Sequence, residues 1–183
     1  MTPFNPRQIW AKYDHQSITV YQAYNSRIAD EALALGRLRR KPRRGLGSLF
    51  RRNRMTWIKP SFLWMMYRSK WASAPNQERV LAIKISNSGF TEILERAVLT
   101  KFEPFVHPSR AEWQKMLRAS DVRCQWDPER TPTGVARQRR AIQLGLKGDA
   151  VRRYVEEWCL EIQDITEFVH HVRSLVGVVS KRG

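Results

Sequence analysis

The sequence predicts an α+β fold, in which helices flank a small, bent sheet of mixed or antiparallel strands within one domain spanning residues 1–183. Three observations support this. In residues 79–86 (RVLAIKIS), Leu81, Ile83 and Ile85 share one face, which is typical of a strand. Ser109 and Glu112 form a capping box that begins an amphipathic helix. The expected strands do not alternate regularly with the expected helices, which argues against a doubly wound parallel sheet.

The first part of the chain is expected to contain a helix, a strand and a second helix. Pro6 suits the first turn of a helix over residues 6–14. Residues 18–24 are β-branched and aromatic, which favours a strand. Ser26 can then cap a helix that ends before Gly36.

The remaining elements follow the same reasoning. Pro60 permits a helix through Arg68 after a short strand at residues 57–58, and residues 88–97 are expected to be helical. The C-terminal part is expected to contain a strand at 122–126 that ends in a turn at 127–130, a strand at 140–146, and C-terminal helices at 149–161 and 165–176.

An arginine-rich segment interrupts this pattern at residues 37–54. It carries nine basic side chains and no acidic one, in a chain of formal charge +16. Pro42, Gly45 and Gly47 favour a mobile loop. Because neutralising phosphates releases counterions, we expect nucleic acid, DNA or RNA, to bind through Arg39, Arg40, Arg43, Arg44, Arg51, Arg52 and Arg54. The alternative is a solvated basic surface that only aids solubility.

The composition also indicates the redox state of the cysteines and the cellular location of the protein. Cys124, expected on a strand, and Cys159, expected on a helix, lack metal-ligand spacing; two reduced thiols are the expected state, with a disulfide as the alternative. The first ten residues have no apolar core, and the apolar run at 62–66 is too short to span a membrane. The histidines lack ligand spacing. We therefore expect a soluble, cytoplasmic protein with no metal and no membrane partner.

Three polar clusters contain the candidate site residues. Gln22 and Tyr24 share one face of the first strand, where the alternative is a polar face in water. The second cluster lies at an expected helix start, where amide groups favour an anion, and contains Lys59, Ser61, Tyr67 and Arg68. A core role is the alternative for Tyr67.

The third cluster surrounds the expected turn at 127–130. Its members are Gln125, Trp126, Asp127, Glu129 and Arg130. An acidic pair in a basic chain can act as a general base or bind a ribose. The alternative is that these carboxylates only neutralise neighbouring arginines.

Several segments resemble those of the uncharacterised family known as domain of unknown function 4291. They are RQIWAKYD, ITVYQAYN, RMTWIKPSFLWMMYRS, QERVLAI, QWDPER, IQLGL and RRYVEEW. The resemblance covers nearly the whole chain, so it implies that these segments form one unit. It implies no established activity.

A second resemblance is to the ADP-ribosyltransferase superfold, which includes RNA 2′-phosphotransferases. The segment TVYQAYNSRIADEALALG is similar to the start of that core, with Gln22 where the superfold usually has His or Arg. Ser61 and Tyr67 follow in the same order. The last strand, RAIQLGL, holds Arg140 and Gln143 but lacks the usual catalytic Glu. That departure weakens ADP-ribosyl transfer; phosphotransferase members rely on basic residues instead.

Together these observations give two main hypotheses. In the first, a nucleic-acid-linked, ADP-ribosyltransferase-like or phosphotransferase-like enzyme uses an NAD-like ligand. The candidate catalytic residues are Glu129, Tyr67 and Arg140, and the candidate cofactor-binding residues are Gln22, Tyr24, Lys59, Ser61, Arg68 and Gln143. In the second, a non-catalytic module binds nucleic acid through the arginine-rich segment, and Trp57, Trp64 or Trp71 stacks on bases. A third interpretation is an interaction domain that dimerises through the C-terminal helices.

Overall fold

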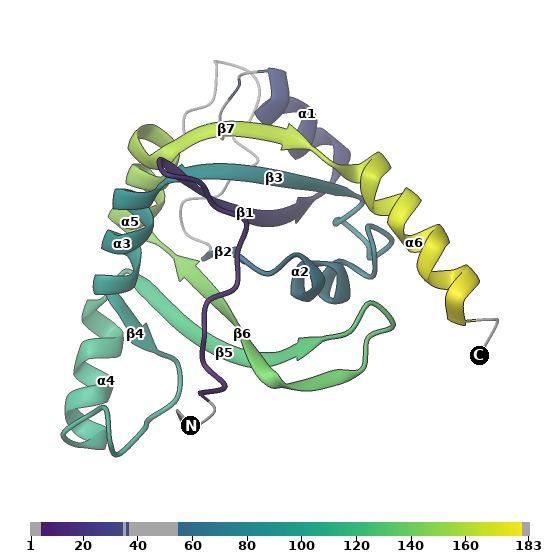
Figure 1. Ribbon diagram of the computed structural model, residues 1–183. Coiled ribbons are helices and arrows are strands. Elements are labelled where there is room, and N and C mark those ends of the chain that lie inside the picture. Colours follow the sequence, from purple (N-terminus) through teal and green to yellow (C-terminus); the bar gives the residue numbers. More distant parts are fainter. Residues whose placement is uncertain (1–4, 35, 37–54, 181–183) are drawn as a thin grey trace.

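The computed structural model describes residues 5–34, 36 and 55–180 (Figure 1). The arginine-rich segment at 37–54, with its predicted mobile loop and its seven candidate nucleic-acid contacts, lies outside the described residues. The described part is a mixed α+β structure, as predicted, but it is built on two small sheets where one was expected. No helix within these ranges is long and apolar enough to cross a membrane.

The first sheet is antiparallel and has the strand order β1-β3-β7. Its strands are β1 (Ser17–Tyr24), β3 (Arg79–Ser86) and β7 (Cys159–Asp164). The prediction of a helix over residues 149–161 was wrong for the C-terminal part of that segment. Helix α5 (Gly148–Arg153) passes through one π-helical turn, η1 (Tyr154–Trp158), into β7, so Cys159 lies on a strand. Pairing with the edge of β3 overrides the local helix preference of this segment.

The second sheet has the order β2-β6-β5-β4. Its strands are β2 (Thr56–Ile58), β6 (Ala136–Leu146), β5 (Val122–Arg130) and β4 (Ala97–Leu99), and only the β4–β5 pair is parallel. The turn expected at 127–130 was wrong, because these residues continue β5. A register shift between Pro128 and Arg130 accommodates the proline, and the turn lies at residues 131–135.

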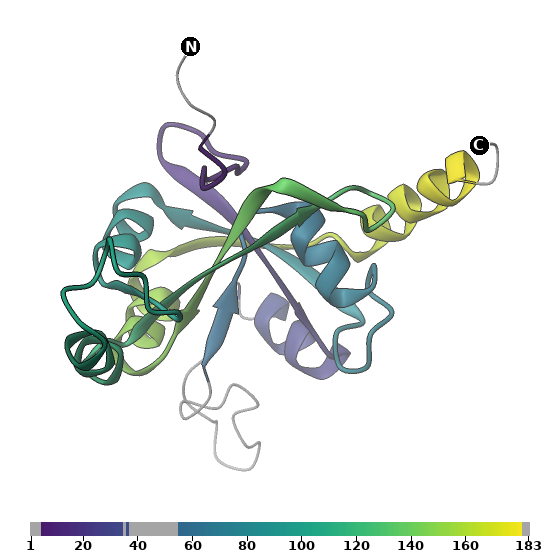
Figure 2. The same cartoon turned by 90° about the horizontal axis from the view of Figure 1, so that it is seen from below.

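The two sheets meet where β1 lies beside the end of β2. Tyr21 and Lys59 exchange backbone hydrogen bonds of 2.8 and 3.3 Å. On one side of this junction, apolar side chains of both sheets form the main core. On the other side, α2 (Phe62–Ser69) packs between the sheets, and α6 (Thr166–Ser180) extends away from them (Figures 1 and 2).

The other helices are α1 (Ser26–Ala34), α3 (Asn87–Glu95) and α4 (Arg110–Ala119). The predicted capping of α4 is confirmed, because the Ser109 hydroxyl accepts a 3.1 Å hydrogen bond from the Glu112 amide. The helix expected over 88–97 is shorter at its C-terminal end, since Ala97 already belongs to β4.

The prediction of a helix over residues 6–14 was wrong. This segment is extended and crosses in front of the sheets (Figure 1). Its backbone pairs with neighbouring strands. The Arg140 amide donates a hydrogen bond to the Pro6 carbonyl and the Thr19 amide donates one to the Lys12 carbonyl, and each bond is 2.8 Å long. These strand contacts replace the hydrogen bonds that a helix would make.

Candidate active site on the polar face of the sheets

A row of polar side chains crosses four adjacent strands on the face opposite the main core. Tyr21 on β1 pairs with Lys59, which directly follows β2. The β2–β6 register ends at Ile58 opposite Leu144, and its extension by one residue places Lys59 beside Gln143. Gln143 in turn reaches Asp127 on β5. Because side chains alternate along a strand, the local geometry of these strands puts all four on one side. We call Tyr21, Lys59, Gln143 and Asp127 the polar row.

Lys59 is the buried cation of the polar row. Only 7% of its surface is exposed, and its ammonium donates a long 3.5 Å hydrogen bond to the Trp57 carbonyl. The pKa of Lys59 is lowered to about 8, chiefly by burial and to a smaller extent by nearby Arg68, while Asp127 partly opposes both effects. Within the described ranges, no carboxylate oxygen lies within 4.0 Å of this ammonium.

Asp127 is held in place by two side-chain amides. Its carboxylate accepts a 2.9 Å hydrogen bond from Gln125 and a 2.7 Å hydrogen bond from Gln143. A carboxylate fixed in this way is oriented without being neutralised. It can therefore accept a proton or bind a hydroxyl group.

Glu129 lies further along β5 and is only 2% exposed. Its carboxylate accepts a 2.6 Å hydrogen bond from the Ser61 hydroxyl and a 2.9 Å hydrogen bond from the Arg130 amide. The same Ser61 oxygen accepts a 3.1 Å hydrogen bond from the Trp64 backbone amide and so caps the N-terminus of α2. This arrangement fixes the start of α2, and the position of Lys59 two residues earlier, relative to β5.

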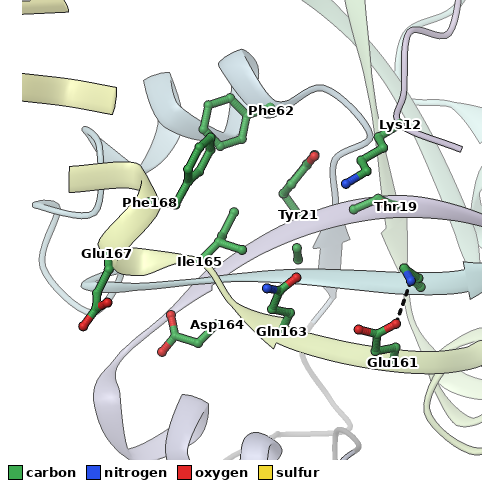
Figure 3. A pocket seen from close by; sticks show the side chains of 12 residues that line it. Lys12, Thr19, Tyr21, Phe62, Glu161, Gln163, Asp164, Ile165, Glu167 and Phe168 are labelled. Carbon is green, nitrogen blue, oxygen red and sulfur yellow. Dashed lines mark ion pairs between the residues drawn. The ribbon is translucent and has the colours of Figure 1, made fainter. Parts of the chain in front are cut away.

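A cavity of about 440 Å³ lies on the first sheet beside the polar row (Figure 3). Tyr21 lines it, and the ring of Tyr21 meets Phe62 edge-on with centroids 5.5 Å apart. Phe168 lies against Phe62 at 5.9 Å. Lys12 reaches in from the N-terminal segment, and Gln163 lines the floor on β7. The cavity therefore combines aromatic walls with polar groups, and three carboxylates also line it: Glu161, Asp164 and Glu167.

Arginine side chains stack on aromatic rings along the edge of the same face. The guanidinium of Arg130 lies 4.0 Å from the ring centroid of Tyr67, and that of Arg139 lies 4.4 Å from the ring of Trp10. Arg139 also lies 3.9 Å from the Glu129 carboxylate. We call these two pairs the aromatic–arginine rim. Trp10 is 55% exposed, so the rim is open to solvent.

The structure brings four of the predicted residues together on the polar face: Lys59, Ser61, Glu129 and Gln143. Arg68 is close enough to lower the pKa of Lys59. Tyr67 is exposed on α2 in the rim.

Three other predicted residues lie elsewhere. Gln22 and Tyr24 point to the opposite side of β1, where the Gln22 side chain joins the Trp57 carbonyl at 3.2 Å and the Tyr154 hydroxyl at 2.8 Å. The Tyr24 hydroxyl is buried beside Thr56. Arg140 lines a separate cavity of about 170 Å³ that also touches Asp127.

Sequence reasoning missed Tyr21, Trp10 and Arg139. Strand alternation gives the signal for Tyr21, since Tyr21 and Gln22 must face opposite sides. The positions of Trp10 and Arg139 depend on how the N-terminal segment crosses β6, and no local pattern encodes that crossing. As for metals, the described residues hold no group of three or more His, Cys, Asp or Glu side chains placed to bind an ion.

Comparison with models of protein families shows to which family the chain belongs. The model described as Domain of unknown function (DUF4291) matches residues 8–182. The chain belongs to this family. The match includes every strand and helix in the part of the DUF4291 protein that the structure describes, and all four members of the polar row. No curated protein matches the DUF4291 chain.

Proposed function

We propose that this DUF4291 protein is a nucleic-acid-linked enzyme that binds a nucleotide, with NAD as the first candidate, on its polar face. The observation that carries the proposal is the buried ammonium of Lys59, which lies beside the ordered Asp127–Gln143 pair. A buried charge is costly unless an opposite charge accompanies it. A phosphate group of a bound ligand would supply that charge.

The surroundings of Lys59 suit a phosphate. Arg68 adds a second positive charge nearby, as its effect on the pKa of Lys59 indicates. Helix α2 begins immediately after Ser61, and the first amides of a helix favour an anion. Lys59 and the first amides of α2 come from consecutive parts of the chain, so one short segment would hold the phosphates. Arg68, further along α2, would act only through its charge.

The cavity at Tyr21 suits the nucleoside part of the ligand. Its volume of about 440 Å³ is within the usual range for small-molecule sites. Tyr21, Phe62 and Phe168 offer aromatic surface to a base, and Gln163 offers an amide. Tyr21 pairs with Lys59 through the backbone, and this supports a nucleotide that places its base in the cavity and its phosphate at Lys59.

The resemblance to the ADP-ribosyltransferase superfold suggests the reaction. In ADP-ribosyl transfer the glycosidic bond to nicotinamide breaks, nicotinamide leaves, and an acceptor nucleophile bonds to the ribose carbon while losing its proton. The superfold usually supplies a Glu from its last strand, which the sequence comparison matched to the strand that holds Gln143; the structure adds β7 after that strand, so the match rests on the sequence resemblance alone. We assign that role to Asp127, which contacts Gln143 directly, because Glu129 is buried and occupied by Ser61. Glu129 then acts as a positioning residue for α2.

Thermal unfolding with NAD tests the binding. Millimolar NAD should raise the melting temperature of the wild-type protein, because a ligand that binds only the folded state stabilises it. Lys59→Met should remove this increase, and the matched surface variant Lys115→Met on α4 should keep it. The absence of any NAD-dependent increase in the wild-type protein would overturn the proposal.

A second candidate function is nucleic-acid binding without turnover, and the aromatic–arginine rim favours it. Basic and aromatic side chains that alternate on a surface suit single strands, because bases stack on rings and arginines hold phosphates. Incubation with NAD and either RNA or DNA distinguishes the two functions. Nicotinamide release that depends on Asp127 supports the enzyme, whereas salt-sensitive binding without release supports the module.

A further inference from the structure

The segment that follows α2 has an unusual backbone. Lys70, Trp71 and Ala72 are consecutive non-glycine residues with φ angles of 51°, 57° and 60°. Left-handed conformations are unfavourable for L-residues and occur mostly singly. Three in succession persist only where the surrounding structure imposes them, and such backbone often accompanies a functional site.

Ser69 is the residue that holds this left-handed turn. It is fully buried, and its hydroxyl donates to the Met66 carbonyl at 3.4 Å and accepts the Ala72 amide at 3.3 Å. The Trp71 amide also donates to the Met66 carbonyl, at 2.9 Å. The turn is therefore fixed by hydrogen bonds to the end of α2.

The left-handed turn brings Lys70 and Trp71 beside Tyr67 and Arg68 on the wall of a second cavity, of about 490 Å³. We call it the α2 cavity. Its opposite wall is the β5–β6 turn at residues 131–134.

The β5–β6 turn is well ordered by its own contacts. The side chain of Arg130 donates to the Gly134 carbonyl at 3.2 Å while stacking on Tyr67. The Thr131 and Thr133 hydroxyls lie 3.0 Å apart. Arg130 thus ties the two walls of the α2 cavity together, so the cavity exists before any ligand binds.

We propose that the α2 cavity binds one unpaired base of a single-stranded nucleic acid, and that Arg68 and Lys70 hold the phosphates beside it. The described lining offers two aromatic rings, two cations, two threonine hydroxyls and no carboxylate. Aromatic rings bind bases of any sequence by stacking, and cations at the edge bind the flanking backbone.

The position of the α2 cavity favours a strand over a free mononucleotide. Its cations are exposed at the edge, and Arg130 connects it to the aromatic–arginine rim, where Arg139 and Trp10 can take the next nucleotides. Tyr67 is 41% exposed and is reached from solvent. The inference rests on the proposed function only for its nucleic-acid partner and does not require the NAD site.

Photo-crosslinking of the full chain tests the inference. The probe is a single-stranded oligonucleotide of about 12 nucleotides that carries one 5-iodouracil, and peptide mass spectrometry locates the crosslink. We expect crosslinks on Tyr67 or Trp71. Tyr67→Leu should lower the yield about tenfold, and the matched variant Tyr13→Leu, which removes an exposed ring outside the cavity, should not.

The outcomes separate this inference from the NAD proposal. Crosslinks only on other residues, or an equal yield from Tyr67→Leu, would overturn the base site. Full competition by uridine monophosphate at the affinity of the oligonucleotide would overturn the assignment to a strand. Lys59→Met should keep the crosslink, and Tyr67→Leu should keep the NAD-induced rise in melting temperature, so either proposal can fail alone.

Discussion

The hydroxyl of Ser61 donates a 2.6 Å hydrogen bond to the buried carboxylate of Glu129. Ser61 lies at the start of α2 and Glu129 lies on β5, so the hydrogen bond joins two segments that are far apart in the sequence. Because the same hydroxyl caps α2, one side chain orients the helix and fixes it to the sheet. The geometry around Lys59 depends on this contact.

Removal of the Ser61 hydroxyl should therefore cost more than the loss of an ordinary helix cap. Ser61→Ala removes the cap and takes the hydroxyl donor away from the buried Glu129 carboxylate, which keeps only the Arg130 amide as a hydrogen-bond donor, so we expect a loss of about 2–3 kcal/mol in the free energy of unfolding. Ser109→Ala is the matched control, an exposed cap on α4, and should lose about 1 kcal/mol. Urea unfolding measures both, and equal losses would show that the Glu129 contact contributes nothing.

Lys59 should make the stability of the protein depend on pH in a distinctive direction. Its pKa is about 8 in the folded state, against 10.5 ordinarily, so between these values the unfolded state binds more protons. Stability therefore rises with pH across that window. Lys59→Met should be more stable than the wild type by up to about 3 kcal/mol at pH 7, and the difference should vanish toward pH 10.5. A difference independent of pH would contradict the buried charge.

The left-handed turn after α2 predicts a conflict between stability and binding. Lys70→Gly relieves a positive φ angle and should stabilise the protein by about 0.5–1 kcal/mol. The same change removes a proposed phosphate contact and should weaken oligonucleotide binding. Lys115→Gly, inside α4 and outside the α2 cavity, is the control: it should lower stability by about 1 kcal/mol and keep oligonucleotide binding. A Lys70→Gly protein that is less stable than the wild type would show that the backbone there is not strained.

Gln22 should support the core and not the ligand. Tyr154→Phe removes the hydroxyl that donates to the Gln22 side chain, and we expect a loss of about 1–2 kcal/mol in stability. The rise in melting temperature caused by NAD should be unchanged in this variant. Loss of the NAD response with unchanged stability would return Gln22 to the cofactor-binding role predicted from the sequence.

Local signals in the sequence predicted the elements whose structure is locally determined. Strand β3 follows from the alternation at residues 79–86, and α4 follows from its capping box. The predictions that were wrong concern segments whose structure depends on partners elsewhere in the chain. Residues 6–14 are extended because they pair with β1 and β6, and β7 forms because β3 offers it an edge.

The candidate site divides in the same way. Lys59 and Ser61 were chosen because the local sequence marks a helix start beside them, and α2 does begin directly after Ser61. Gln22 was chosen over Tyr21 because composition does not give the phase of a strand relative to the core. The Arg139–Trp10 pair depends on the crossing of two distant segments, which a single sequence does not reveal.

Isothermal titration of NAD at pH 8, in two buffers with different heats of protonation, tests most directly whether Lys59 binds the nucleotide phosphate. With a pKa of about 8, about half of the Lys59 side chains are neutral before binding, and a bound phosphate raises the pKa and charges them. We expect an uptake of about half a proton per NAD in the wild-type protein, and no binding in Lys59→Met. Binding without proton uptake, or equal uptake in Lys59→Met, would contradict the account.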